Sequence, residues 1–219
     1  MGGRRDGRSA VPSPEFCEDD MHRPVLITSP AIQPVSLAAA KLHLRVDHND
    51  EDALIESLIR AATEHLDGWT GILGRCLVEQ IWRQDHDRFA REMIIPLGPV
   101  IAVQSITWRD PAGQLSTVPS GSYDLRTDEA GNAIIRFDAD YIFPTNLHES
   151  RAIAITFKAG YPTNPGPPAA STVPDPLKVA ILLLVGHWYQ NREATSSAGM
   201  ASLPFAVEAL IAPYRRMQL

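Results

Sequence analysis

The chain has little cysteine and a shortage of positive charge, and each shortage excludes some classes of protein. Its 219 residues include two cysteines, Cys17 and Cys76, far apart and without the spacing of a metal site or a disulfide framework. This scarcity of cysteine is typical of a protein that folds in a reducing cytoplasm. Acidic residues number 26 and basic residues 20, and the resulting net charge of -6 disfavours tight binding of phosphates over the whole surface.

Long apolar segments are also missing. The longest apolar run, Val179 to Val185, is far below the roughly 20 residues that cross a bilayer. The first 20 residues are charged and lack the apolar centre of a signal peptide. We therefore expect no membrane association, and we expect residues 1–24 to form a disordered tail, with Met21 as a possible alternative start.

Motifs for nucleotides and for known catalytic sites are missing as well. The most suggestive group is Asp85-His86-Asp87, which an uncharacterised hydrolase could use. In a strand, however, Asp85 and Asp87 share one face and His86 points to the other, so we expect a solvated strand instead. We predict no catalytic residue, no metal and no cofactor.

Two helices are predicted near the start of the chain. Ser36 is a good N-cap for a short helix over 37–44. A second helix is expected over about 51–69, where apolar residues recur at helical spacing, with Gly68 and Gly71 at its end.

The middle of the chain has the pattern of an antiparallel β structure. Short strands with turn residues between them are expected over 80–89, 94–97, 100–108, 115–118, 123–125, 133–137 and 152–158.

Helices return after a Pro-rich linker over 160–176. Asp175-Pro176 suits a helix start, and the helix over about 177–190 is apolar on nearly every face. Such a helix must be covered on several sides, either within one chain or by a neighbouring subunit. A last helix is expected from Phe205 to about Ala212.

The predicted fold class is therefore α+β. A helical core combines residues 25–77 with the linker and C-terminal helices over 161–219, and an antiparallel β lobe over 78–160 is inserted between them.

Several stretches in this order resemble one family, the head–tail connector (adaptor) proteins of long-tailed phages and phage-like gene transfer agents. They are Pro34 to Asp47, Glu51 to Ile55, Thr70-Gly71, Gly160-Tyr161, Val173 to Leu177, Ile181 to Val185, His187-Trp188-Tyr189-Gln190-Asn191-Arg192-Glu193-Ala194, and Leu210 to Arg215.

The resemblance implies a structural protein of the particle neck, assembled in the bacterial cytoplasm, that forms a dodecameric ring under the portal protein. The ring would extend the DNA channel, without sequence-specific DNA binding, and would carry the stopper protein. The portal contacts implied are Phe205, Leu210, Ile211, Tyr214, Arg215 and Arg216, although Phe205, Leu210 and Ile211 could instead close the subunit core. The ring contacts are expected at Leu182, Val185, Trp188, Tyr189, Arg192 and Glu193. A stopper or terminator of the same neck is the alternative, ahead of a hydrolase.

Overall fold

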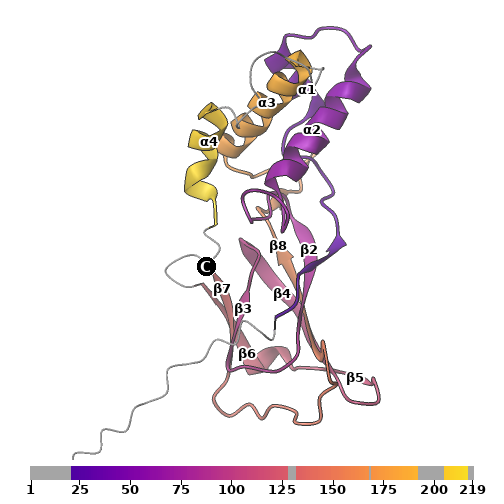
Figure 1. The fold of residues 1–219 in the computed structure, drawn as a ribbon, viewed down its shortest axis with the longest axis vertical. Coiled ribbons are helices and arrows are strands. Elements are labelled where there is room, and N and C mark those ends of the chain that lie inside the picture. Colours follow the sequence, from indigo (N-terminus) through magenta and orange to yellow (C-terminus); the bar gives the residue numbers. More distant parts are fainter. Residues whose placement is uncertain (1–20, 128–131, 168, 192–204, 217–219) are drawn as a thin grey trace, which may run out of the picture.

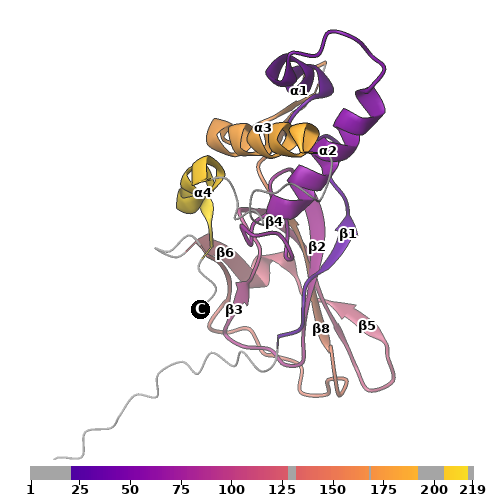
Figure 2. The same ribbon diagram turned by 45° about the horizontal axis from the view of Figure 1, so that its top comes forward.

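Helices and sheets occupy opposite ends of the molecule. The computed structural model describes residues 21–127, 132–167, 169–191 and 205–216. Figure 1 shows the α-helices α1 to α4 at one end and the strands β2 to β8 at the other, and Figure 2 shows the same division after a rotation. The α+β fold class is confirmed.

The N-terminal helices form close to where the sequence predicts them. Helix α1 spans Leu37–Leu44, and the Ser36 hydroxyl oxygen accepts a hydrogen bond from the Ala39 amide at 3.2 Å. Helix α2 spans Asp52–Leu66 and buries Ile55, Ile59 and Leu66 on one face. It ends three residues earlier than predicted, because Asp67 leaves helical geometry and binds the following loop.

The C-terminal helices are α3, Asp175–Gln190, and α4, Phe205–Ile211. Pro174, rather than Asp175, occupies the N-cap of α3. Asp175 lies in the first turn, where a negative charge suits the positive end of the helix.

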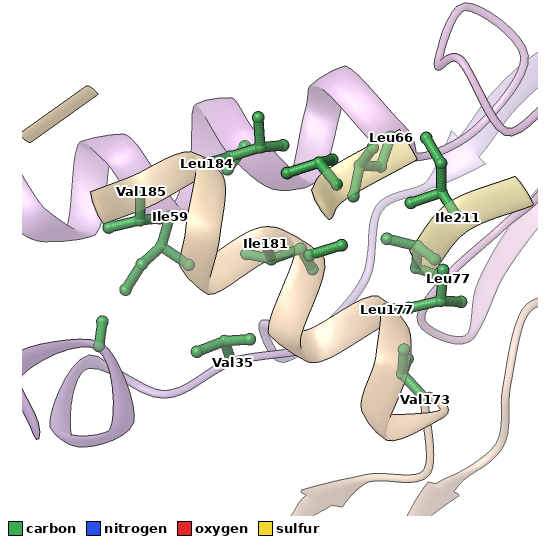
Figure 3. Close-up of a cluster of buried hydrophobic side chains, with 14 of the residues drawn as sticks. Val35, Ile59, Leu66, Leu77, Val173, Leu177, Ile181, Leu184, Val185 and Ile211 are labelled. Carbon is green, nitrogen blue, oxygen red and sulfur yellow. The ribbon is translucent and has the colours of Figure 1, made fainter. Parts of the chain in front are cut away.

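One apolar cluster joins all four helices. Figure 3 shows α3 in the middle of this cluster, with Ile59 and Leu66 of α2 along one side and Ile211 of α4 at one end. Ile181 of α3 is fully buried at its centre, and Val35, just before α1, is also buried there. Segments from both ends of the chain therefore form one helical core.

The predicted antiparallel β lobe contains two antiparallel sheets in the described residues. The larger has the order β1-β2-β8-β4-β5, with bounds Val25–Thr28, Gln80–His86, Ile153–Ala159, Val100–Arg109 and Leu115–Thr117. The smaller has the order β3-β7-β6, with bounds Glu92–Ile95, Ala133–Phe137 and Tyr123–Thr127. A second apolar cluster, including Ile106, Phe137 and Phe157, lies within this lobe.

Two local differences from the expected organisation have clear physical causes. Strand β1 lies before the first predicted helix, within the residues 25–77 that we assigned to the helical core, and its Val25 and Leu26 pair with Arg83 and Trp82 of β2. The Pro-rich linker also contains a short hairpin of β9, Thr163–Asn164, and β10, Ala170–Ser171. In both places the backbone satisfies its hydrogen bonds by pairing with a neighbouring strand.

Candidate interaction surfaces

The outward row of α3 is the first candidate surface. Val179 is 42% exposed, and Leu182, Leu183 and Gly186 are partly exposed. These positions are separated by three or four residues, so they form one stripe along the helix. Helices α2 and α4 lie on either side of α3 (Figure 1), and α1 covers the end of the row at Gly186, where an added Cβ would lie 3.4 Å from the His43 ring. The part of the stripe that stays accessible to another subunit is therefore formed by Val179, Leu182 and Leu183.

The ring residues expected from the sequence do not all lie on that row. Leu182 does, whereas Val185 is fully buried in the helical core of its own chain. Trp188 packs edge-on against His65, with 6.1 Å between ring centroids, and the Tyr189 hydroxyl donates to the Glu51 carboxylate. Both aromatic side chains remain partly exposed. Arg192 and Glu193 lie outside the described residues.

Sequence reasoning missed Val179 and Leu183 as surface candidates. The apolar run gives no contrast between its inner and outer faces, so its helical period could not be oriented from sequence. The positions that α2 and α4 cover distinguish the two faces.

The C-terminal segment is the second candidate surface. In α4, Val207 and Ile211 are buried, whereas Phe205 is 86% exposed. Leu210 and Tyr214 are partly buried. This exposure makes Phe205 the large apolar side chain of α4 with the most surface to bury against a partner.

The two arginines after α4 contact their own chain. The exposed Arg215 donates from Nε to the Ile72 carbonyl at 3.3 Å. The Arg216 amide donates to the Leu73 carbonyl at 2.9 Å, and its guanidinium binds the Pro96 carbonyl. These bonds position the end of α4 against the loop that leads from α2 into the β lobe.

A buried polar network lies where the helical end meets the β lobe. The Asp67 carboxylate accepts hydrogen bonds from the Leu77 amide at 2.5 Å and from Gln80 Nε2 at 3.0 and 3.1 Å. Gln80 Oε1 accepts in turn from the Trp82 indole at 3.1 Å. Burial raises the pKa of Asp67 above its ordinary value, although these hydrogen bonds oppose the shift. We call this group the Asp67 network.

Asp85, His86 and Asp87 differ from the solvated strand that we expected. Asp85 is 5% and His86 7% exposed, because Met21 and His22 lie across the end of β2: Met21 bridges His86, and the His22 amide donates to the Asp85 carbonyl at 2.9 Å. The expectation of solvation was wrong for these two residues.

The carboxylates of the trio have separate partners. Asp85 pairs with Arg83, with 2.9 Å between Oδ1 and Nε. Asp87 pairs with His22 at 2.7 Å and accepts from the Arg151 amide at 2.6 Å, and the His22 hydrogen bond is the main cause of its lowered pKa. The geometry gives the two carboxylates structural roles rather than a shared catalytic one.

Within the described ranges, no group of three or more His, Cys, Asp or Glu side chains could hold a metal ion. No helix in those ranges has both the length and the apolarity needed to cross a bilayer.

Comparisons with known proteins identify relatives of this fold. The family model described as phage gp6-like head–tail connector protein matches residues 34–109 and 145–215. A search of curated proteins found no match.

Solved structures with the same fold come from gene transfer agent particles. A chain from the neck of an empty particle, computed with C6 symmetry, is 25% identical, with a TM-score of 0.70, over 90% of this chain and 97% of that chain. A chain from the virion of a native particle is 24% identical, with the same TM-score and coverage. A chain from the neck of a native particle, computed with C12 symmetry, is 23% identical with a TM-score of 0.69, over 90% of this chain and 97% of that chain.

The family match and the neck structures that share the fold define a structural protein of a phage-like particle. The chain belongs to the phage gp6-like head–tail connector family, and it is a structural component of the particle neck.

Proposed function

We propose that this chain forms a dodecameric ring under the portal protein of a phage-like particle, where it extends the DNA channel and carries the stopper and the tail. The family match over both halves of the helical core carries this proposal. Twelve copies are supported by the C12 symmetry with which the neck of one structural relative was computed.

The proposed ring interface centres on the outward row of α3. Leu182 and Val179 have exposed surface on this row. Trp188 and Tyr189, nearer the end of α3, are partly exposed and are proposed to contribute beside the row. Each large apolar side chain that becomes fully buried contributes about 1.5–3 kcal/mol. A head-to-tail interface also needs a second, different surface on the neighbour, and Arg192 and Glu193, which follow α3 in the sequence, are proposed to pair with it. Val185, buried in its own chain, supports the interface from beneath.

The proposed portal contact is the segment from α4 to Arg216. Phe205 supplies the exposed aromatic group, and Leu210, Tyr214 and Arg215, further along the segment, each have exposed surface. Ile211 and Arg216 hold the segment in place, since one packs into the helical core and the other binds Leu73 and Pro96. They therefore contribute to portal binding mainly by orienting their neighbours.

The acidic balance of the chain supports a channel role. A net charge of -6 gives few sites for tight phosphate contacts, so DNA can pass through the lumen without being held. A non-enzymatic role and assembly in the bacterial cytoplasm follow from the same proposal. A stopper or terminator of the same neck is the alternative, and an electron microscopy map decides between them by the position of this chain relative to the portal.

The test is a variant that removes the exposed aromatic group. Phe205→Ala should leave the thermal stability of the purified chain unchanged, because the side chain is 86% exposed. Without the Phe205 ring to bury, binding of each copy of this chain to the portal should weaken by about 1.5–3 kcal/mol, or roughly 10- to 150-fold in affinity. Particles made with this variant should contain portal-bearing heads with neither this chain nor tails.

The matched control is Phe205→Trp, which keeps a large apolar ring at the same place and should retain tails. Normal tail attachment by Phe205→Ala would contradict the portal contact. A map with this chain on the tail side of another ring would contradict the adaptor position itself.

A further inference from the structure

An apolar side chain stands exposed on a braced loop at the far end of the β lobe. The loop joins β7 to β8 and runs along the end of the molecule away from the helices (Figure 1). Ile142, within this loop, is 88% exposed, the highest exposure among the large apolar side chains in the described part of the chain.

The exposure of Ile142 follows from how its two neighbours are held. The Tyr141 ring stacks on Phe137, with 5.4 Å between centroids, and the Phe143 ring stacks on Phe89 at 5.2 Å. Since both flanking aromatic side chains face the lobe, the residue between them is directed outwards.

Arg91 fixes the backbone of the same loop. Its guanidinium donates to the Asp138 carbonyl and, at 3.4 Å, to the Tyr141 carbonyl. The same group lies over the Phe143 ring, 4.7 Å from its centroid. The loop is therefore ordered before any partner binds, which reduces the entropy lost on binding.

The charges beside Ile142 indicate the chemistry of the partner. Asp138 and Asp140 are exposed, and among the ion pairs of the described residues neither carboxylate takes part in one. An apolar side chain bordered by two unpaired carboxylates complements an apolar pocket bordered by Lys or Arg.

This surface lies outside the segments that the family model matches. The family model matches residues 34–109 and 145–215, so the stretch that contains Ile142, Asp138 and Asp140 lies between the matched segments. It also lies at the opposite end of the molecule from α4, where the portal contact is proposed (Figure 1).

The geometry points to the loop around Ile142 as the docking site for the neck protein that follows this ring on the side away from the portal. That protein would receive Ile142 in an apolar pocket and would pair basic side chains with Asp138 and Asp140. This inference rests on the proposed function, and it assigns the tail-side contact to the β lobe rather than to the helices.

The test uses whole particles and two separate readouts: the amount of this chain per head, and the amount of the following neck protein and tail per head. Ile142→Asp should leave the melting temperature and the first quantity unchanged. It should lower the amount of the following neck protein and tail per head about tenfold or more, since the apolar contact is lost and a charge enters the pocket. Asp138→Lys combined with Asp140→Lys should lower the second quantity too.

Leu115→Asp is the matched control. Leu115 is 64% exposed on a different hairpin of the same lobe, and its change should leave both quantities unchanged. Normal tail attachment by Ile142→Asp would overturn the inference, as would an equal loss with Leu115→Asp. Loss of this chain from heads in Ile142→Asp would instead assign the loop to another copy of the chain or to the portal. Heads that gain tails without this chain at all would contradict the proposed function rather than the docking site.

Discussion

Two adjacent residues of α3 provide a direct test of how this helix is oriented. Ile181 is fully buried between the other helices, whereas Leu182 lies on the outward row. Replacing each by alanine removes a similar volume of side chain. The two variants should therefore differ only because their surroundings differ.

The structure sets the size of the expected difference. Ile181→Ala leaves a cavity inside the helical core (Figure 3), and such changes cost about 2–5 kcal/mol. Leu182→Ala removes a side chain that is only partly covered, at a cost of about 1 kcal/mol. For a chain of this length each kcal/mol lowers the melting temperature by about 2–4 °C, so Ile181→Ala should lower it by roughly 4–20 °C.

Urea and thermal denaturation of the purified chain measure both values, at a concentration where sedimentation detects no assembly. In particles, the amount of assembled ring should respond differently from stability. Leu182→Ala should reduce ring formation by more than its small effect on the stability of the chain explains. Equal destabilisation by the two changes would refute the orientation of α3, and with it the outward row as a ring interface.

Two further predictions concern the region where the helices meet the β lobe. Gly160 has a φ of +111°, and an added Cβ would lie 2.3 Å from the Val78 carbonyl oxygen. Gly160→Ala should therefore lower the free energy of unfolding by about 1–3 kcal/mol in a urea titration. Gly121→Ala, where an added Cβ meets nothing within 4 Å, should cost much less, and equal losses in the two variants would contradict the close approach at Gly160. Asp67 has a pKa raised above its ordinary value of 3.8, so its contribution is most favourable below that pH and is lost as the pH rises through the raised pKa. The free energy of unfolding of Asp67→Asn should therefore decline less between about pH 3.5 and 7 than that of the unchanged chain, and identical pH slopes would show that the carboxyl is not desolvated.

Local signals predicted local structure well. Ser36 marks the start of α1 because its hydroxyl satisfies a backbone amide within the same turn. Strands β4 and β7 lie within a residue of the predicted bounds, because turn residues separate them from their neighbours.

Features that depend on distant partners could not be predicted. Residues 25–28 pair with a strand more than 50 positions away along the chain, and nothing in their own composition specifies that partner. Asp85 and His86 are buried because residues 21 and 22 return to cover them. The outward row of α3 and the exposure of Ile142 likewise depend on which elements pack beside them.

The chain passes between the helical end and the β lobe through residues 29–36, 67–79 and 160–174, and the bonds of Arg216 to Leu73 and Pro96 add a further link. A lobe joined by a single segment could rotate freely about that segment, but one joined through several crossings and the Asp67 network resists bending and twisting. A displacement imposed on the helices would therefore also displace the tip of the lobe. In the proposed neck, a displacement of the portal contact would therefore move the tail-side contact as well.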